Sequence, residues 1–247
     1  IVLYLPKNRD RILSAAALVL IHEFFMRVPL VSGWGAGSFG LEDNFVRFLD
    51  ILLLGEAHLY GGMGIPFDPE GLLSTLPAAV TLLSGFWLGE YLRRPIAHQE
   101  KLTNLTVVGI ILFFAGSLLG LIEPINKQLW TVSYVIVMAG LAVLMIVFSS
   151  YLIDVKKMTF WTKPAIVFGS NPLVVFVGSG IIGRLLYMVK TTDAEGNIIS
   201  IKHAIYNGFF VPLAGDLNGS LLYALTNITI WLGILWYLYY RKIFVKI

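Results

Sequence analysis

The chain of 247 residues contains no cysteine and few charged residues. Without cysteine, the chain can form neither disulfide bonds nor a catalytic thiolate. Only 13% of the residues are charged and 57% are hydrophobic, so a soluble domain of this length would lack a charged surface. The net charge of +3 is too small to indicate nucleic-acid binding. These deficits indicate a membrane protein.

Motifs of several enzyme classes are absent as well. The sequence has no GxxxxGK[ST], no HExxH and no GxSxG pattern, and it has no cluster of Cys and His residues with metal-ligand spacing. P-loop hydrolysis of ATP, zinc proteolysis and serine-hydrolase chemistry therefore have no support. We expect no metal.

Long apolar runs predict membrane-spanning helices, each of which needs about 20 mostly apolar residues. Six runs qualify, namely Ile12–Leu30, Leu72–Leu92, Thr103–Ile122, Leu129–Ile153, Pro164–Val189 and Leu217–Tyr240. We therefore predict an all-α fold, a polytopic bundle of about six transmembrane helices that forms a single transmembrane domain over residues 1–247.

Positive charge gathers in alternate loops between these runs. Twelve of the eighteen Lys and Arg residues fall on one side of the alternation. They are Lys7, Arg9, Arg11, Arg93, Arg94, Lys101, Lys156, Lys157, Lys163, Arg241, Lys242 and Lys246. The positive-inside rule assigns this side, and with it the C-terminus, to the cytoplasm. We predict a multi-pass protein integral to the lipid bilayer.

Two segments depart from simple spans. In the first outer loop, Phe45–Leu54 is apolar, but its ten residues are too few to cross a bilayer, so we predict an interfacial or re-entrant segment. The fifth run is interrupted by GSNP at Gly169–Pro172, where Asn171 can cap a new helix. Broken helices are tolerated in membranes where they line a cavity.

The second run begins with FDPEGLLSTLP, which places carboxylates where water meets membrane. Asp68 suits an N-cap, Pro69 suits the first helical position, and Glu70 suits the positive end of the helix dipole. The carboxylates either form an ordinary helix cap or bind a polar substrate. Upstream, in LDILLLGEAHLYGG, His58 is either a surface residue or a proton carrier, since imidazole titrates near neutral pH.

Intramembrane ionisable residues are costly, so function is their default interpretation. His22 and Glu23 lie deep in the first run, and we favour a structural salt bridge from Glu23 to Arg27, one turn away. In EPINKQLW, Asn126 and Lys127 either anchor the turn or meet an anionic or carbonyl-rich ligand.

A second basic group follows the second run. Arg93, Arg94 and Lys101 either reflect the positive-inside rule alone or bind phosphates by charge.

Five segments occur in an order that resembles one family. They are LLLGEAHLY, FDPEGLLSTLP, NKQLWTVSYV, GSNPLVVFVG and YRKIFVKI. From about Arg9 to Ile247, the chain resembles the C-terminal half of the heparan-α-glucosaminide N-acetyltransferase family, whose bacterial relatives include the NagX-type membrane proteins.

The resemblance implies a membrane transferase that passes acetyl from cytoplasmic acetyl-CoA to a glucosamine-like amino sugar on the outer face, here of a bacterial inner membrane. It also implies a catalytic histidine in an outer loop of the N-terminal half, and none of His22, His58, His98 and His203 matches that context. The catalytic residue is therefore unknown. We expect this chain to need the missing half as a partner and to be inactive alone, and we leave a homo-oligomer open.

Under this hypothesis, the candidate residues divide between the two substrates. The acceptor-side candidates are His58, Asp68, Glu70, Asn126, Lys127 and Asn171, the last as a hydrogen-bond donor in a cavity wall. The candidates for binding CoA phosphates are Arg93, Arg94 and Lys101. The alternative is a transporter or permease for a sugar or cell-wall fragment, which the broken helix favours and the lack of a second broken helix disfavours. A structural membrane subunit without chemistry is a third interpretation.

Overall fold

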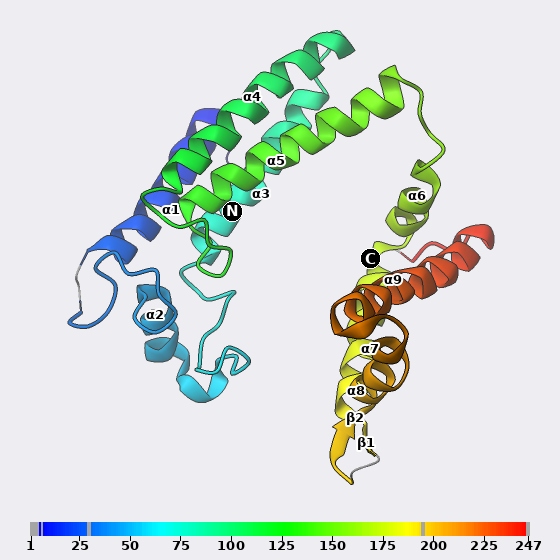
Figure 1. Cartoon of the computed structure of the whole chain (residues 1–247). Coiled ribbons are helices and arrows are strands. Elements are labelled where there is room, and N and C mark those ends of the chain that lie inside the picture. The colour runs from blue at the N-terminus through cyan, green and yellow to red at the C-terminus, as the bar shows by residue number, and fades with distance from the viewer. Residues whose placement is uncertain (1–4, 6, 29–30, 194–195, 246–247) are drawn as a thin grey trace. The chain divides into compact units, whose positions relative to one another are not determined.

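The structure is a computed structural model that describes residues 5, 7–28, 31–193 and 196–245. The chain forms two compact units, unit 1 over Ile1–Lys156 and unit 2 over Lys157–Ile247, which we describe separately (Figure 1). The single transmembrane domain stays a prediction. The expected end of the first run at Leu30 and the cationic Lys246 lie outside the described residues.

Unit 1 consists of helices and the loops that join them. Its α-helices are α1 (Asn8–Arg27), α2 (Phe45–Leu54), α3 (Thr75–Leu92), α4 (His98–Leu119) and α5 (Val132–Ser150). A 3-10 turn over Glu56–His58 follows α2, and α5 continues as a π-helical turn over Tyr151–Val155. Each of the four runs predicted in this part of the chain therefore contains one of these helices.

The helices α4 and α5 pack with their backbones in close contact. A Cβ atom on Gly140 of α5 would lie 2.5 Å from the backbone nitrogen of Phe113 in α4. A Cβ atom on Gly109 of α4 would lie 2.8 Å from the Leu144 side chain. Small residues at such positions allow membrane helices to approach closely, so these glycines set the spacing of the pair.

Side-chain contacts show which helix ends of unit 1 lie together, and they form two groups at opposite sides of the unit. At one end, Trp87 of α3 donates a hydrogen bond from Nε1 to Oδ1 of Asn8, the first residue of α1, at 2.8 Å. At the other end, Ser74 before α3 donates from Oγ to the carbonyl oxygen of Leu129 before α5, at 3.2 Å. His22, near the end of α1, contacts the same carbonyl oxygen. Helix α1 therefore runs antiparallel to α3, whereas α3 and α5 begin at the same end of the unit.

Residues 31–74 fold into a small layer at the second of these ends, which we call the outer cap after the side of the membrane that the charge pattern predicts for it. Its core joins residues of the cap to α1 and to the turn before α5, and consists of Met26, Phe45, Val46, Phe67, Leu73 and Leu129. The helix α2 covers the same ten residues that were predicted as an interfacial or re-entrant segment. Its last three leucines are exposed, which suits contact with a membrane surface.

The predicted helix start at Asp68 is wrong. Asp68 does accept a hydrogen bond from the backbone N–H of Glu70 at 2.9 Å, but the chain turns through residue 74 and α3 begins at Thr75. The cause is a tertiary contact, because Oδ1 of Asp50 in α2 accepts the backbone N–H of Leu72 at 2.9 Å. The segment is thereby tied to the outer cap rather than to the ladder of α3.

Unit 2 begins with α6 (Thr162–Ser170) and α7 (Pro172–Met188), which meet at 78°. The break lies at Asn171–Pro172, as GSNP predicts. An antiparallel hairpin of β1 (Lys190–Thr192) and β2 (Ile198–Ser200) follows. The chain then continues through α8 (Ile201–Ile205), a π-helical turn (Tyr206–Phe210) and α9 (Val211–Tyr240). The backbone of α9 is interrupted at Gly215, whose φ is 75°, close to the predicted start of the sixth run.

Within the described residues, three helical stretches are long and apolar enough to cross a membrane, namely His98–Leu119, Val132–Val155 and Ile201–Tyr240. The bent pair α6–α7 raises the number to four if it counts as one span. The helices α1 and α3 do not meet this test; α1 carries charged residues near both of its ends. The predicted helical membrane protein is confirmed, while the six spans stay a prediction.

Candidate functional site

A buried group of ionisable side chains lies where α1 meets the loop before α5. His22 and Glu123 are almost fully buried, with side chains 0% and 1% exposed. The carboxylate of Glu23 connects them to a cation, since its Oε2 accepts from Nε of Arg27 at 2.6 Å. Nη2 of Arg27 then lies 3.6 Å from Oε2 of Glu123. We call these four residues the His22 cluster.

Both ring nitrogens of His22 face hydrogen-bond acceptors. Nε2 lies 3.2 Å from the carbonyl oxygen of Leu129, and Nδ1 lies 3.4 Å from Oε1 of Glu23. A carbonyl oxygen and a carboxylate can only accept, so each contact needs a proton between its two atoms. Through its contact with the Leu129 carbonyl oxygen, the His22 side chain links α1 to the loop before α5.

Glu123 joins the cluster to α5. Its Oε1 accepts the backbone N–H of Val132, the first residue of α5, at 2.8 Å. Burial raises the pKa of the Glu123 carboxyl, and the negative charge of Glu23 adds to the rise, although the Val132 N–H and the Arg27 guanidinium oppose it. The sequence analysis did not single out Glu123. The available signal was a carboxylate directly after the apolar run LLGLI.

A second buried carboxyl lies in the outer cap. Asp50 is fully buried, and while its Oδ1 binds the Leu72 N–H, its Oδ2 has no hydrogen-bond partner among the described residues. Burial raises the pKa of the Asp50 carboxyl, and the charge of nearby Asp68 raises it further, against the opposing effect of the Leu72 N–H. Burial with a single hydrogen bond thus disfavours the charged form of Asp50 relative to that of an exposed carboxyl.

The acceptor-side candidates of the outer cap differ in exposure. His58 is exposed, and its Nδ1 contacts the carbonyl oxygen of Leu54 at 2.8 Å, at the end of α2. Asp68 is half-buried, whereas Glu70 is exposed. The side chain of Glu70 is thus accessible to a soluble ligand, while Asp68 also closes a local turn.

The turn before α5 lies against the outer cap. Nε2 of Gln128 lies 3.7 Å from Sδ of Met63, which belongs to the cap. Oδ1 of Asn126 accepts the backbone N–H groups of Gln128 and Leu129, at 2.8 and 3.3 Å, so its amide shapes the turn. Lys127 is exposed beside it. The structure thus brings five of the six acceptor-side candidates to one end of unit 1.

The sixth candidate, Asn171, lies in unit 2 and is fully buried. Its Nδ2 donates to the carbonyl oxygen of Ile243 at 3.0 Å, and its Oδ1 accepts the N–H of Val245 at 2.8 Å. The side chain does not cap α7, although it stands at the position predicted for the cap. It binds the C-terminal segment to the α6–α7 junction instead.

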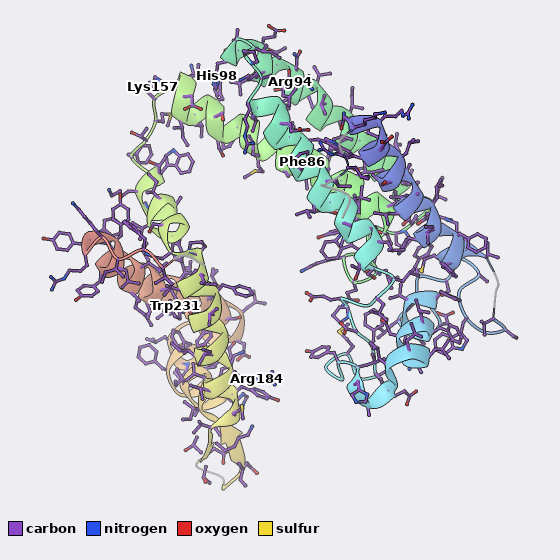
Figure 2. All side chains as sticks on the ribbon, turned by 180° about the vertical axis from the view of Figure 1, so that it is seen from behind. Phe86, Arg94, His98, Lys157, Arg184 and Trp231 are labelled. Carbon is purple, nitrogen blue, oxygen red and sulfur yellow. The ribbon has the colours of Figure 1, made fainter. Side chains whose placement is uncertain are left out.

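The candidates for CoA phosphates lie at the opposite end of α3 from the outer cap (Figure 2). Arg93 and Arg94 are exposed, and the guanidinium of Arg94 lies 5.4 Å from the ring centre of Tyr91. Nζ of Lys101 donates to the carbonyl oxygen of Leu92 at 2.7 Å, at the end of α3. The 18 residues of α3 separate the two candidate groups by about 27 Å at 1.5 Å per residue.

A pocket of 590 Å³ lies between these two ends, bordered by α3, α4 and α5. Its lining is mostly apolar, and its polar members include Ser84, Tyr91 and Asn104. Nδ2 of Asn104 donates to the Tyr91 hydroxyl at 2.9 Å. Among the residues that the structure describes, no group of three or more His, Cys, Asp or Glu side chains is placed to hold a metal ion.

Comparison with known proteins identifies relatives of one kind. Heparan-alpha-glucosaminide N-acetyltransferase of Mus musculus is 26% identical over 266 aligned residues, which cover 96% of this chain and 37% of the relative. The protein of the same name from Homo sapiens is 29% identical over 165 residues, covering 58% of this chain and 24% of the relative. No model of a known protein family matches the chain. The chain spans little more than a third of the length of the mouse relative, and its predicted resemblance to the heparan-alpha-glucosaminide N-acetyltransferases is confirmed.

Proposed function

We propose that this chain forms part of a membrane acyltransferase that passes an acetyl group from cytoplasmic acetyl-CoA to a glucosamine-like amino sugar on the outer face, in a bacterial inner membrane. The observation that carries this proposal is the similarity to proteins named N-acetyltransferases over 96% of the chain. The chain covers 37% of the length of the mouse relative, and we propose that the complete reaction also uses residues outside this segment.

The arrangement of unit 1 supports a reaction with a substrate on each side of the membrane. The acidic and basic candidates lie at opposite ends of α3, about 27 Å apart, close to the roughly 30 Å thickness of a bilayer's hydrocarbon core. The exposed Arg93 and Arg94 suit the phosphates of CoA, which stay in the cytoplasm. Asp68 and Glu70 suit the ammonium and hydroxyl groups of an amino sugar at the outer cap.

The chemistry requires three steps from the complete protein. A general base removes a proton from the sugar ammonium, and the free amine attacks the thioester carbonyl. The C–N bond forms and a tetrahedral oxyanion develops, which hydrogen-bond donors stabilise. The C–S bond then breaks, the positively charged nitrogen loses a second proton to become the amide, and the CoA thiolate takes up one proton. The base releases the other proton to solvent. His58 is the exposed imidazole of the outer cap, while the base that the family resemblance implies lies outside this chain.

The bent pair α6–α7 is the observation that favours the second candidate function, a sugar permease. Transport along this break would need free polar groups there. Asn171, at the break, instead directs both ends of its amide to the C-terminal segment. The acyltransferase therefore agrees better with the local geometry.

Transfer across a vesicle membrane separates the two functions. The full-length protein is reconstituted with labelled acetyl-CoA outside and glucosamine inside, and the products inside are analysed. We expect labelled N-acetylglucosamine inside, and none in vesicles without protein. If glucosamine leaves the vesicles unmodified and no labelled product forms, the acyltransferase is wrong and the permease is favoured.

A further inference from the structure

Unit 2 contains a pocket that the proposed reaction does not use. It has a volume of 560 Å³ and lies between the beginning of α6 and the end of α9. Its lining consists of two lysines and four aromatic residues, namely Lys163, Trp236, Tyr239, Tyr240, Lys242 and Phe244. We call it the Lys163 pocket.

The walls of the Lys163 pocket are held in place by contacts. Nζ of Lys163 lies 4.7 Å from the ring centre of Tyr239 and 3.4 Å from its hydroxyl. The rings of Tyr239 and Phe244 meet edge to face at 6.2 Å. Asn171 binds the backbone of the residues on either side of Phe244, at positions 243 and 245. The C-terminal wall is therefore fixed to the α6–α7 junction.

The positive charge at the pocket has no carboxylate beside it in the described lining. From residue 157 onward, the sequence contains only Asp193, Glu195 and Asp216 as acidic residues. Asp193 belongs to the hairpin beyond α7, and Asp216 lies 23 residues before Tyr239, about 35 Å away along α9. Arg241, next to Lys242, adds a further cation. Such a site attracts an anion.

The position of the pocket indicates which anion. It lies at the end of α9, which closes a helical stretch long and apolar enough to cross a membrane. Lipid headgroups lie at this level, where Tyr and Trp side chains gather. Lysines and tyrosine hydroxyls can bind a phosphate, and the rings offer apolar surface to the carbon atoms next to it.

We propose that the Lys163 pocket binds the phosphate group of an anionic phospholipid, with Lys163 and Lys242 on the phosphate and the aromatic side chains against the glycerol and upper acyl carbons. Both lysines are exposed, so the headgroup reaches them from the membrane surface without unfolding of unit 2. The proposal does not depend on acetyl transfer.

Native mass spectrometry of the full-length protein in detergent tests this site, with phosphatidylglycerol and phosphatidylcholine as probes. We expect preferential retention of phosphatidylglycerol. The double variant Lys163→Gln/Lys242→Gln should bind it roughly tenfold more weakly, since each basic residue near an anionic headgroup adds to the attraction. Equal binding of the two lipids by the wild type would overturn the proposal.

The matched control is Lys190→Gln. Nζ of Lys190 lies 4.8 Å from the ring centre of Tyr187, nearly the geometry of Lys163 on Tyr239, but it lies outside the pocket. We expect this variant to bind phosphatidylglycerol as the wild type does, and an equal loss in both variants would contradict a specific site. A second experiment adds coenzyme A as a competitor of the lipid. If it displaces the lipid and its own binding is lost in the double variant, the phosphate comes from a soluble ligand, and the lipid assignment is wrong.

Discussion

The two units contain buried polar groups of different kinds. In unit 2, Asn171 is neutral and its amide is bonded at both ends to the backbone of the C-terminal segment. In unit 1, Glu23 and Glu123 share one arginine, and Asp50 has an oxygen without a described partner. A satisfied neutral group stabilises a fold, whereas a partly satisfied carboxyl costs stability. From this comparison we predict that the buried carboxyls lower the stability of unit 1, whereas the Asn171 amide raises that of unit 2.

Removing the cation of the His22 cluster should have the largest effect. Arg27→Gln leaves Glu23 and Glu123 facing each other without a counter-charge. We expect a loss of about 2 kcal/mol, less than for a fully buried pair because the Arg27 side chain is 39% exposed. The measurement is thermal unfolding of the purified protein in detergent micelles.

A matched control and a second variant make this result specific. Arg184→Gln, at an exposed position of α7, should change the unfolding temperature little. Adding Glu123→Gln to Arg27→Gln should restore part of the loss, because one of the two facing charges is gone. If Arg27→Gln unfolds like the Arg184 control, the cluster is no charge network and the contrast between the units disappears.

The amide of Asn171 should matter to the fold of unit 2 alone. Asn171→Ala removes two hydrogen bonds and leaves the backbone groups of residues 243 and 245 without them, which should cost about 1–2 kcal/mol. Limited proteolysis near the C-terminus reports the release of this segment. The exposed Asn218→Ala serves as control, and equal cleavage of the two variants would show that Asn171 does not bind the segment.

The smallest stability effect should come from Asp50, and its sign depends on pH. The folded-state pKa of Asp50 lies above its usual value of 3.8. The stability that its carboxyl contributes is therefore fully present below pH 3.8 and is lost as the pH rises through the folded-state pKa. Asp50→Asn keeps an acceptor for the Leu72 N–H and removes the charge. We expect the variant to be more stable than the wild type by about 1 kcal/mol at pH 7.

A pH series of unfolding temperatures checks this prediction. The difference between Asp50→Asn and the wild type should shrink as pH falls toward 4. The pKa of the Glu123 carboxyl is also raised, so Glu123 changes the stability with pH in the same direction as Asp50. The series is therefore repeated in a Glu123→Gln background, which leaves the effect of Asp50. A wild type that is more stable than the variant at pH 7 would mean that Asp50 is charged and has a partner.

Local patterns in the sequence were enough to predict most of the helices, but not α8 or the first six residues of α9. The apolar segment Phe45–Leu54 is a helix, and the break at Asn171–Pro172 lies where a proline without an N–H interrupts the ladder. The start of α3 at Thr75 could not be predicted, because it depends on the contact of Asp50 with Leu72, 22 residues later in the sequence.

The contacts of the buried candidate residues could not be predicted for the same reason, because they join residues that are even farther apart in the sequence. His22 contacts a carbonyl oxygen 107 residues away, and Asn171 binds a backbone 72 residues away. Periodicity along one helix carries no information about such partners. The sequence could show that Glu23 and Arg27 pair one turn apart, but not that Glu123 completes the cluster.

We propose that opposite ends of α3 serve different substrates. A steady-state kinetic comparison of two variants of the full-length protein, with each substrate varied in turn, tests this division directly. We predict that Arg93→Gln/Arg94→Gln raises KM for acetyl-CoA by about tenfold and leaves KM for the amino sugar unchanged, since charge-assisted bonds to phosphate are lost. Glu70→Gln should do the reverse. If both variants change KM for the same substrate, or if neither changes any KM, the division of unit 1 into a donor end and an acceptor end is contradicted.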